Sequence, residues 1–559
     1  MPSRFQNMRT LVATATYNER DNIELLLSDI FALDDQIEAL VIDDASPDGT
    51  GALLDQLAAS EPRLHVVHRH AKLGLGSAHQ LAFAYAIQHD FGRLITMDAD
   101  ISHNPSSIPA LLKALEDADM VIGSRYVKGG SSDYSGYRKF VSVCANTLAR
   151  ILLGIPLHEF TTSFRAFDVD MLRRYRCSKL RSNGYSFFTE TIFRLESAGF
   201  RLAEVPIHFK DRHEGVSKLP SAEVFRGVAK LFRLAVSRAT GRNVFHAATE
   251  IDDKCVHCTS PFLIEIFSKQ DETAQPVTDN DGSRAAAAYS CSSVERRAKP
   301  QVVQCLNCGL IHIPKKLVPQ DIGSLYGDVE DTNYLADISA RRAGFRETYR
   351  RILKHIGATG RLLEIGAYCG LFLAEAEAGG WQCEGIEPSR WATNKAKENT
   401  AAPVHVGTLA ENRDKLEPGF DAIVAWDVLE HVKQPFEMLE DVGRLIRPGG
   451  VFCFSTLDID NWFPRLLGKR WPWIMDMHLH YFSGSLLRRW LDHAGYDLIE
   501  VLPYRHYASA RYAWTKGADI FPPVFARALK VVAPVIPAGL VLPFSFGDIK
   551  LFVARRRTE

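Results

Sequence analysis

The sequence predicts an α/β protein with two largely parallel sheets in separate domains. Its 559 residues exceed what one hydrophobic core accommodates, so we expect two large domains and a small one. Strand and helix patterns alternate from "TLVATAT" to about residue 245, and again from "RLLEIGAYCG" at 361–370 to the end. Between them lie two CxxC pairs and a polar segment without periodicity, 269–290, which we expect to be a mobile, disordered loop.

The composition is that of an ordinary globular protein, with 46% apolar and 24% charged residues. The net charge of −1 gives no footprint of bulk nucleic-acid binding, which usually shows as a strongly basic domain. No signal peptide is visible, and ten cysteines, most of them scattered, suit a reducing cytosol. The longest uncharged apolar run, 531–547, contains three prolines and is shorter than the ~20 residues that a spanning helix needs. We therefore expect a cytoplasmic protein.

Acidic or amide side chains follow three predicted strands of the first alternation. They are Asn18 with Glu19, Asp43 with Asp44, and Asp98 with Asp100. Asp98 and Asp100 are two residues apart, so in an extended chain both carboxylates leave on the same side, where their charges repel. Ligands of open α/β sheets bind beyond the carboxyl ends of the strands. Three such strand ends predict a ligand crevice.

This first half resembles the glycosyltransferase family 2 enzymes of GT-A fold, specifically the dolichol-phosphate mannosyltransferase-like group. The matching stretches follow the family's order through 9–220 and include "TYNERDNI", "VIDDASPDGT", "MDADISHNP", "TSFRAF" and "EVPIHFKDRHEGVSKL". The resemblance implies that Tyr17, Glu19 and Asp44 contact the nucleoside of a GDP- or UDP-linked sugar. It also implies that Asp98 and Asp100 bind Mg²⁺ or Mn²⁺ against the diphosphate, because the charge of that leaving group needs a hard cation.

Basic residues recur in the matched stretches, and we expect them on the acceptor side. They are Arg125, Arg165, Arg212 and Lys218. Arginine forks and the lysine ammonium suit phosphate, although ion pairs are the commonest use of a single arginine. The resemblance implies a polyprenyl phosphate acceptor, dolichyl or undecaprenyl. Its phosphate is ionised at neutral pH, so we expect no general base.

Two residues depart from the family's pattern. Ser102 stands where the family commonly has Gln, two residues after the second Asp of the metal motif. Ser163 replaces the Gly that is usual before Phe-Arg. Both departures bear on the geometry of the metal site and on the choice of donor.

The stretch 222–238 has an apolar helical stripe, with Arg226, Lys230 and Arg233 on the opposite side. Such a basic amphipathic helix lies in the headgroup plane of anionic lipid or packs on its own domain. A second helix of this kind is predicted over 138–154. Family members often carry C-terminal spanning helices, which this chain lacks. We therefore expect peripheral binding at the cytoplasmic face of a membrane, directly or through a membrane-anchoring partner protein.

Two CxxC pairs form a four-thiolate set, Cys255 and Cys258 with Cys305 and Cys308. Zn²⁺ in tetrahedral coordination is the expected occupant, with a structural role. The alternative is a set of buried thiols without a metal. We expect His257, inside the first pair, to be a bystander rather than a ligand.

The second alternation opens with an apolar strand, a glycine turn and a helix, followed by a strand that ends in Glu387. Gly366 and Gly370 allow the backbone to approach a ligand closely. Glu387 is placed to bind ribose hydroxyls, as acids at this position do in other nucleoside-binding α/β units. A glycine turn alone would also fit NAD.

Three stretches further along, "FDAIVAWDVLEHVKQP", "LIRPGGVFCFST" and "HYFSGSLLRRWLDHAGY", resemble the class I S-adenosylmethionine-dependent methyltransferases. A zinc-binding segment before such a domain resembles methyltransferases of sugar and polysaccharide pathways. The resemblance implies that Glu364, Gly366, Gly370 and Glu387 hold the methionine and ribose parts of S-adenosylmethionine.

The same resemblance places Asp427 and His431 near the transferred methyl group. His478 and His480, in "MDMHLHYFS", are candidates for the acceptor site. A histidine there can deprotonate an attacking hydroxyl near neutral pH, or simply fill a surface groove.

These observations predict a bifunctional enzyme in three parts. We expect a family 2 glycosyltransferase over 1–245, a zinc-ribbon-like segment over 250–315 and a class I methyltransferase over 316–559. The first part would transfer a sugar from a nucleotide donor to a polyprenyl phosphate, and the last would methylate a sugar, glycolipid or polysaccharide intermediate of the same pathway. Two alternatives stay open: a non-lipid glycan acceptor for the first part, and for the last a zinc-containing RNA methyltransferase, which predicts a basic second half.

Overall fold

The structure is a computed structural model and describes most of the chain. The described residues are 8–134, 136–175, 184, 186–210, 221–240, 251, 253–268, 299–319, 332–335, 337–511, 514, 535–537 and 539–558. They divide into two compact units, one built mainly from residues before 255 and the other mainly from residues after 309. The predicted loop at 269–290, Arg212 and Lys218 lie outside the described residues.

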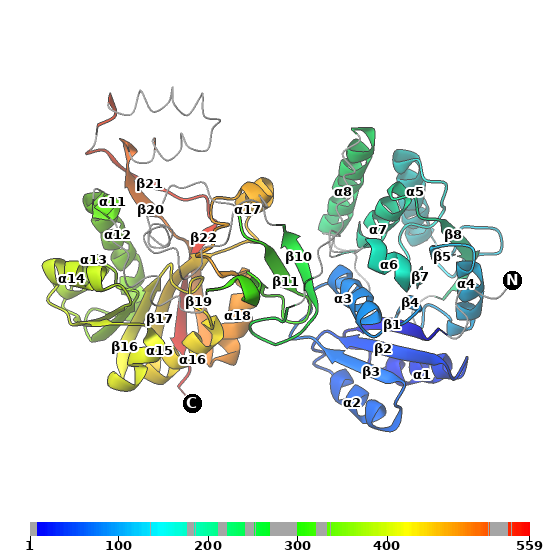
Figure 1. Cartoon of the computed structure of the whole chain (residues 1–559), viewed down its shortest axis with the longest axis horizontal. Coiled ribbons are helices and arrows are strands. Elements are labelled where there is room, and N and C mark those ends of the chain that lie inside the picture. Colours follow the sequence, from blue (N-terminus) through cyan, green and yellow to red (C-terminus); the bar gives the residue numbers. More distant parts are fainter. Residues whose placement is uncertain are drawn as a thin grey trace. The chain divides into compact units, whose positions relative to one another are not determined.

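The first unit is built on a seven-stranded sheet in the order β3-β2-β1-β4-β7-β5-β8 (Figure 1). Its strands are β1 (Thr10–Thr16), β2 (Ile37–Asp43), β3 (Leu64–His68), β4 (Arg93–Asp98), β5 (Met120–Ser124), β7 (Arg165–Asp168) and β8 (Leu202–Pro206). β1 pairs in parallel with β2 on one side and with β4 on the other. The strand order therefore reverses between β1 and β4, the place where ligands of open α/β sheets bind. β7 is antiparallel to both of its neighbours.

Helices cover both faces of this sheet, because alternate residues of its strands enter two different cores. Leu11 and Leu40 belong to one core, and Val12 and Val41 belong to the other. The helices are α1 (Arg20–Phe31), α2 (Thr50–Ser60), α3 (Leu75–Gln88), α4 (Ile108–Leu115) after the short η1 (Pro105–Ser107), α5 (Gly136–Leu153), α6 (Val169–Tyr175), α7 (Ser186–Ser197) and α8 (Ser221–Ala239). A small two-stranded sheet pairs β6 (Ser131–Ser132) with β9 (His208–Phe209).

The predicted amphipathic helix over 222–238 is α8, which packs against α5 and α7. Leu231 and Leu234 are buried in the first core, and the Lys230 ammonium pairs with Glu190 at 2.9 Å. One stripe of α8 therefore packs on its own domain. Over the described part of the chain, every helix is too short or too polar to cross a membrane.

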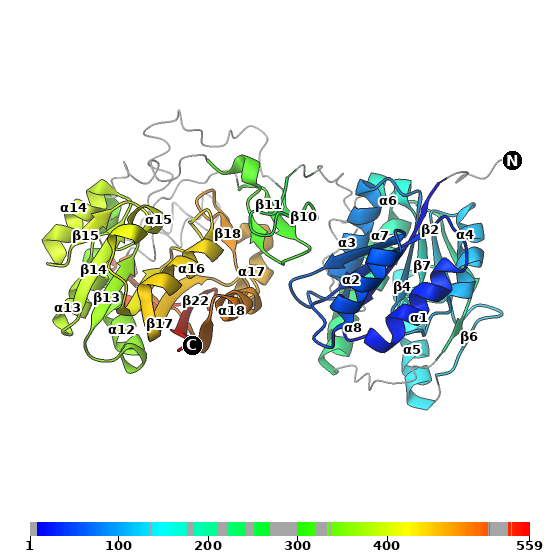
Figure 2. The same cartoon turned by 90° about the horizontal axis from the view of Figure 1, so that it is seen from below.

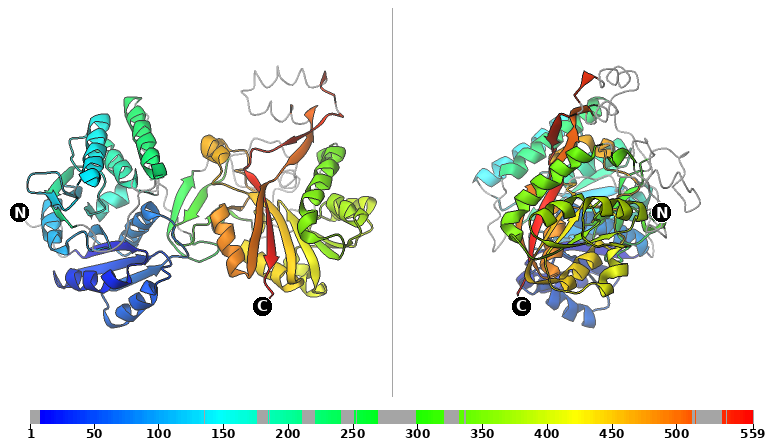
Figure 3. Two further views of the ribbon diagram at one scale, coloured as in Figure 1. Left: turned by 180° about the vertical axis from the view of Figure 1, so that it is seen from behind. Right: turned by 90° about the vertical axis from the view of Figure 1, so that its left-hand side faces the viewer.

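The second unit has a seven-stranded sheet in the order β15-β14-β13-β16-β17-β22-β19 (Figure 2). Its strands are β13 (Arg361–Ile365), β14 (Gln382–Glu387), β15 (Val404–Val406), β16 (Phe420–Trp426), β17 (Ile446–Leu457), β19 (Tyr496–Pro503) and β22 (Ile549–Arg556). The order reverses between β13 and β16, which pair in parallel. β22 is antiparallel to β17 and β19 and is the red strand within this sheet in Figure 3.

Helices accompany the second sheet as the alternation predicts. They are α11 (Thr332–Leu335), α12 (Ile338–Ile356), α13 (Leu371–Ala378), α14 (Arg390–Asn399), α15 (Leu409–Asn412), α16 (Pro435–Leu445), α17 (Trp462–Leu467) and α18 (Gly484–His493), with short 3₁₀ turns η4 (Arg413–Lys415) and η5 (Gly468–Arg470). β20 (His506–Ser509) and β21 (Val541–Phe544) form a separate two-stranded antiparallel sheet.

A smaller sheet carries the cysteine pairs. Its strands are β10 (Leu263–Phe267), β11 (Val302–Cys305), β12 (Ile311–His312) and β18 (His480–Tyr481), in that order. The 3₁₀ turn η3 (Lys315–Leu317) follows β12.

Candidate functional site

Asp98 and Asp100 stand at the carboxyl end of β4, beside the point where the strand order of the first sheet reverses. Ser163 Oγ donates a hydrogen bond to Asp98 Oδ1 at 2.7 Å, and Ser102 Oγ donates one to Asp100 Oδ1 at 2.5 Å. Both serines are buried, whereas both carboxylates are partly exposed. A hydroxyl that holds one oxygen of a carboxylate fixes its orientation toward a cation. The two departures from the family's pattern thus fall on the groups that hold the paired carboxylates.

His103 supports the same strand end. Its Nδ1 accepts a hydrogen bond from the Asp98 backbone N–H at 3.2 Å, and its Nε2 lies 3.2 Å from Thr162 Oγ1. A backbone N–H can only donate, so Nδ1 is the unprotonated nitrogen and Nε2 carries the proton. Burial lowers the pKa of His103, against the opposing charge of Asp98, and this favours the neutral ring. His103 therefore positions Asp98 without adding a charge to the predicted cation site.

The predicted nucleoside contacts gather at the carboxyl ends of β1 and β2. Tyr17 follows β1 and is 38% exposed, with the Lys72 ammonium 4.0 Å from the centroid of its ring. Glu19 is the N-cap residue of α1. Asp44 follows β2 and is buried against Arg69, whose Nε donates to Asp44 Oδ1 at 2.5 Å. Burial raises the pKa of Asp44, while the Arg69 guanidinium opposes that rise. These groups offer an exposed aromatic ring and a fixed carboxyl to a nucleoside.

The basic residues of the matched stretches have different environments. Arg125 is buried and forms a two-pronged ion pair with Glu159, in which Nε and Nη2 donate at 2.7 and 2.9 Å. Arg165 is also buried and donates to three backbone carbonyls. The expected phosphate contact of Arg165 is therefore corrected, because the side chain is 1% exposed and its Nε, Nη1 and Nη2 each donate to a backbone carbonyl. The acceptor-side role of Arg125 stays a prediction. The same holds for Arg212 and Lys218, which lie outside the described residues.

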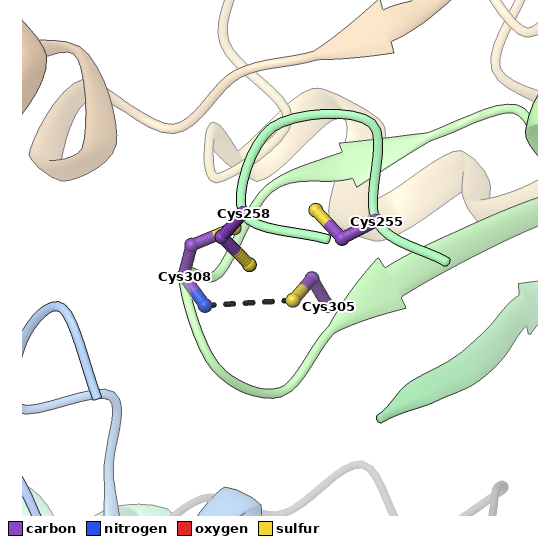
Figure 4. Close-up of side chains that lie close together, drawn as sticks. All are labelled: Cys255, Cys258, Cys305 and Cys308. Atoms are coloured by element: carbon purple, nitrogen blue, oxygen red, sulfur yellow. Dashed lines mark hydrogen bonds between the residues drawn. The ribbon is translucent and has the colours of Figure 1, made fainter. Parts of the chain in front are cut away.

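The four cysteines of the CxxC pairs come together (Figure 4). Cys255 and Cys258 lie at a turn before β10, Cys305 ends β11, and Cys308 lies on the turn that follows it. Their sulfur atoms all lie within 4.8 Å of one another, and the Cys308 backbone N–H donates to Cys305 Sγ at 3.5 Å. Four thiolates gathered this closely match the tetrahedral donor set of Zn²⁺. The histidine between the first two, His257, packs instead against rings of α16 and α18.

The glycine turn after β13 forms a cradle of backbone. Gly366 and Gly370 have φ of +74° and +71°, and Tyr368 between them has φ of +46°. A Cβ on Gly366 would lie 2.6 Å from Val428 Cγ2, and one on Gly370 would lie 2.8 Å from Thr400 Cγ2. Left-handed backbone and close approach both favour glycine at these two positions. The turn leads directly into the N-terminus of α13, whose first backbone N–H groups have no carbonyl partner within the helix.

Two buried carboxyl groups flank this cradle. Glu387 ends β14, and its two oxygens accept hydrogen bonds from the backbone N–H groups of Tyr368 and Ser389 at 2.9 and 2.8 Å. Burial raises the pKa of Glu387 to about 7, and these hydrogen bonds oppose the rise. Burial and the charge of Glu387 raise the pKa of Glu364 well above its usual range. Glu364 Oε2 has no hydrogen-bond partner among the described residues, so it offers an acceptor to an amine or hydroxyl of a bound ligand.

A polar cluster lies beyond the carboxyl end of β16. Asp427 has φ of +53°, and its Oδ1 accepts a hydrogen bond from Ser455 Oγ at 2.6 Å. Glu430, His431 and His478 come together, with one ligand atom of each within 4.8 Å of the others. The rings of His431 and His478 are in contact, with centroids 4.8 Å apart. The predicted places of Asp427 and His431 near the transferred methyl group stay predictions.

His480 lies outside that cluster. It begins β18, and its Nε2 lies 3.0 Å from the Val432 carbonyl oxygen. Burial lowers the pKa of His480 to about 3, so the ring is neutral at physiological pH. Its Nδ1 is buried and has no hydrogen-bond partner among the described residues. Its role in acceptor binding stays a prediction.

Sequence reasoning did not single out Arg69, His103 or Glu430. Arg69 lies in "RHAKLGLGSAH", His103 in "MDADISHNP" and Glu430 in "DVLEH", so each belongs to a stretch that carried the resemblance. The only signal for them was this membership, because their roles depend on partners that the fold brings near.

Two family models match the chain in different places. Residues 11–176 match glycosyl transferase family 2, and residues 338–501 match a methyltransferase domain. The two matches follow the order that the sequence predicted.

Similar proteins of known name match the first half. Polyprenol monophosphomannose synthase of Mycolicibacterium smegmatis is 42% identical over 226 residues, which are 40% of this chain and 85% of that protein. Undecaprenyl-phosphate mannosyltransferase of Micrococcus luteus is 40% identical over 227 residues, which are 40% of this chain and 93% of that protein. A solved structure, glucosyl-3-phosphoglycerate synthase of Mycobacterium tuberculosis, is 22% identical with a TM-score of 0.32 and covers 42% of this chain and 81% of its own.

Proposed function

We propose a bifunctional enzyme acting on lipid-linked sugar, because the chain belongs to glycosyl transferase family 2 and carries a methyltransferase domain in the same polypeptide. The first part, 1–245, transfers a hexosyl group from a nucleotide sugar to a polyprenyl phosphate. The last part, 316–559, methylates a sugar or glycolipid intermediate with S-adenosylmethionine as the donor. The similarity to two mannosyltransferases named for lipid phosphates is the observation that carries the first activity.

The strand end of β4 supports the chemistry of glycosyl transfer. An acceptor phosphate oxygen forms the new bond to the anomeric carbon, and the nucleoside diphosphate leaves with the electrons of the old one. Mg²⁺ or Mn²⁺, held by Asp98 and Asp100, would supply the positive charge that this diphosphate needs. Ser163 and Ser102 fix the two carboxylates, and Asp44 with Tyr17 is suited to hold the nucleoside.

The glycine cradle supports S-adenosylmethionine as the methyl donor. The ribose hydroxyls would donate to Glu387, whose carboxylate is fixed by two backbone N–H groups. The ammonium group of the methionine part would meet the buried Glu364 carboxyl, where a charged partner stabilises the ionised acid. Both acids would then be paired by the ligand rather than left to repel each other.

The Cys255, Cys258, Cys305 and Cys308 set is proposed to bind a structural Zn²⁺. All four sulfur atoms are supplied by the protein, which leaves no coordination position for substrate. Such a closed site stabilises the fold of the 250–315 segment and takes no part in either transfer.

An exposed apolar surface on α5 and α8 is proposed to rest on the lipid that carries the acceptor. Its side chains are Tyr137, Phe140, Val143, Leu148, Ile151, Val228, Phe232 and Val236. α5 and α8 pack side by side, so these residues lie on neighbouring helices (Figure 1). Arg150 and Arg233 on the same helices suit anionic headgroups. Vesicle flotation tests this directly: wild-type protein should float with anionic vesicles, and a Phe140→Ser/Phe232→Ser variant should not.

The glycosyl transfer is tested with a screen of radiolabelled nucleotide sugars and a polyprenyl phosphate. Label should pass into organic-extractable lipid with at least one donor, and removal of divalent cations should abolish it. Label that appears only in water-soluble glycan would instead support the non-lipid acceptor. Calorimetry with S-adenosylmethionine tests the second half separately, so either activity can fail without the other.

A further inference from the structure

Glu430, His431 and His478 form a cluster that the fold assembles from two separated segments, with Glu430 and His478 buried and His431 half-buried. Glu430 and His431 lie on the loop between β16 and α16, and His478 lies just before β18. The two segments are joined by backbone hydrogen bonds from the Leu479 and His480 N–H groups to the Glu430 carbonyl, at 2.8 and 3.2 Å. The cluster is therefore held by the backbone on both sides.

Each histidine of the cluster is fixed by a backbone carbonyl. His431 Nδ1 lies 2.9 Å from the Met477 carbonyl oxygen, and His478 Nδ1 lies 2.7 Å from that of Trp473. A carbonyl oxygen can only accept, so Nδ1 carries the proton in both rings and each Nε2 presents its lone pair. This is the arrangement in which histidines ligate metals, with the second nitrogen donating to a carbonyl or carboxylate.

The carboxylate of Glu430 is oriented in the same way. Glu430 is 1% exposed, and its Oε2 accepts a hydrogen bond from Thr456 Oγ1 at 2.8 Å. A buried acid needs a compensating positive charge when it is ionised. The ligand atoms of Glu430, His431 and His478 lie within 4.8 Å of one another, which is a spacing that one ion can bridge.

We infer that Glu430, His431 and His478 bind a divalent first-row transition metal ion of the zinc type. Two imidazole nitrogens with one carboxylate oxygen form a donor set that suits such ions better than it suits Mg²⁺. Three protein ligands leave at least one position for an exchangeable oxygen ligand, in contrast to the closed four-cysteine set. This site is also separate from Asp98 and Asp100, which offer only carboxylate oxygens.

The open position gives the metal a role in the second activity, and this role rests on the proposed methyl transfer. A hydroxyl oxygen of the acceptor bound there would have its pKa lowered by the ion, as bound water does. The occupancy of the site does not depend on that role, because it follows from the three side chains and their carbonyl and hydroxyl supports.

Cobalt(II) is the probe that distinguishes this site from the cysteine set. The metal-depleted full-length chain is loaded with Co²⁺ in excess Mg²⁺, which occupies carboxylate sites, and bound cobalt is counted after dialysis. Cobalt bound by four thiolates has strong sulfur-to-metal charge-transfer absorption in the near ultraviolet, whereas cobalt bound by nitrogen and oxygen has none. Cys308→Ser removes the thiolate signal and should leave the second ion in place.

We expect wild-type protein to hold one cobalt ion that has no thiolate absorption. Glu430→Gln and His478→Gln should each lose that ion, and His493→Gln, a histidine of α18 outside the cluster, should keep it. Circular dichroism checks that the variants fold. If His478→Gln does not fold, Glu430→Gln, which keeps the shape of the side chain, provides the test. Wild-type protein without such an ion, or a Glu430→Gln variant that retains it, would overturn the inference. S-adenosylmethionine plays no part in the measurement, so failure of the proposed methyl transfer would be seen separately.

Discussion

Ser163 Oγ donates a hydrogen bond to Asp98 Oδ1 at 2.7 Å, across 65 residues of sequence. Asp98 is the last residue of β4, and Ser163 comes just before β7, the antiparallel neighbour of β4. Ser163 is the position at which the expected family pattern has glycine, and glycine has no side chain that could make this contact. The contact makes Ser163 a positioning residue for the proposed cation.

Replacing Ser163 with alanine should weaken the cation site without removing it. The Asp98 carboxylate would lose the hydrogen bond that orients it, and loss of such a supporting partner costs about tenfold in metal affinity. The Mn²⁺ concentration for half-maximal sugar transfer should rise by that factor, while transfer at saturating Mn²⁺ changes less. Ser60→Ala, an exposed serine at the end of α2, should leave the Mn²⁺ dependence unchanged. An unchanged Mn²⁺ dependence in Ser163→Ala would separate this serine from the metal.

Arg125 and Glu159 should behave as a coupled pair in stability measurements. Arg125→Leu leaves the buried Glu159 carboxylate without its partner and should lower the free energy of unfolding by about 3 kcal/mol or more. The double variant Arg125→Leu/Glu159→Leu should recover most of that loss, because no charge is left buried. Urea unfolding of the four proteins of this cycle measures the coupling. Additive losses would mean that the two residues contribute to stability independently.

The affinity for S-adenosylmethionine should depend on pH through Glu387. The pKa of this carboxyl is about 7 in the folded protein, and in the proposed complex the ribose hydroxyls would donate to its ionised form. Binding therefore strengthens as pH rises through 7, and the dissociation constant should fall about tenfold between pH 6 and pH 8 as the ionised fraction grows. Calorimetry across this range should show that slope in wild-type protein and a flat profile in Glu387→Gln. A flat wild-type profile would place the ribose elsewhere.

The cysteine set should hold zinc that is needed for stability. Cys308→Ser should lose one zinc ion per chain and unfold at a lower temperature, because binding of a structural metal adds directly to folding. Cys369→Ser is the matched control, since both cysteines are 1% exposed and only Cys308 belongs to the set. Metal analysis and thermal unfolding of the two variants provide the comparison. Equal zinc contents would mean that the cysteine set does not bind zinc.

Much of the fold could be predicted because it depends on local pattern. The alternation of strands and helices places two α/β units correctly, and Asp98, Asp100 and Glu387 stand at strand ends as expected. The directions of β7 and β22 were not predictable, because an apolar strand has the same pattern in parallel and antiparallel pairing. Strand order depends on contacts between segments that are far apart in the sequence, and a local pattern does not contain these contacts.

The supporting contacts of the sites were beyond sequence reasoning for the same reason. Glu430 and His478 meet although 48 positions separate them, and Arg125 meets Glu159 across 34. Single residues of these pairs were visible in motifs, but their partners were not. Arg165 is an example. Its place in a motif predicted a phosphate ligand, and only its burial and its hydrogen bonds to backbone carbonyls revealed a structural role.

Transfer of labelled sugar into extractable polyprenyl-phosphate lipid tests the central claim most directly. Wild-type protein with Mn²⁺ should produce this lipid, Asp98→Ala should reduce it to background, and Asp117→Asn, an exposed acid in the same unit, should match wild type. Label in lipid that is unaffected by Asp98→Ala, or no lipid-linked label with any common nucleotide sugar, would contradict the account.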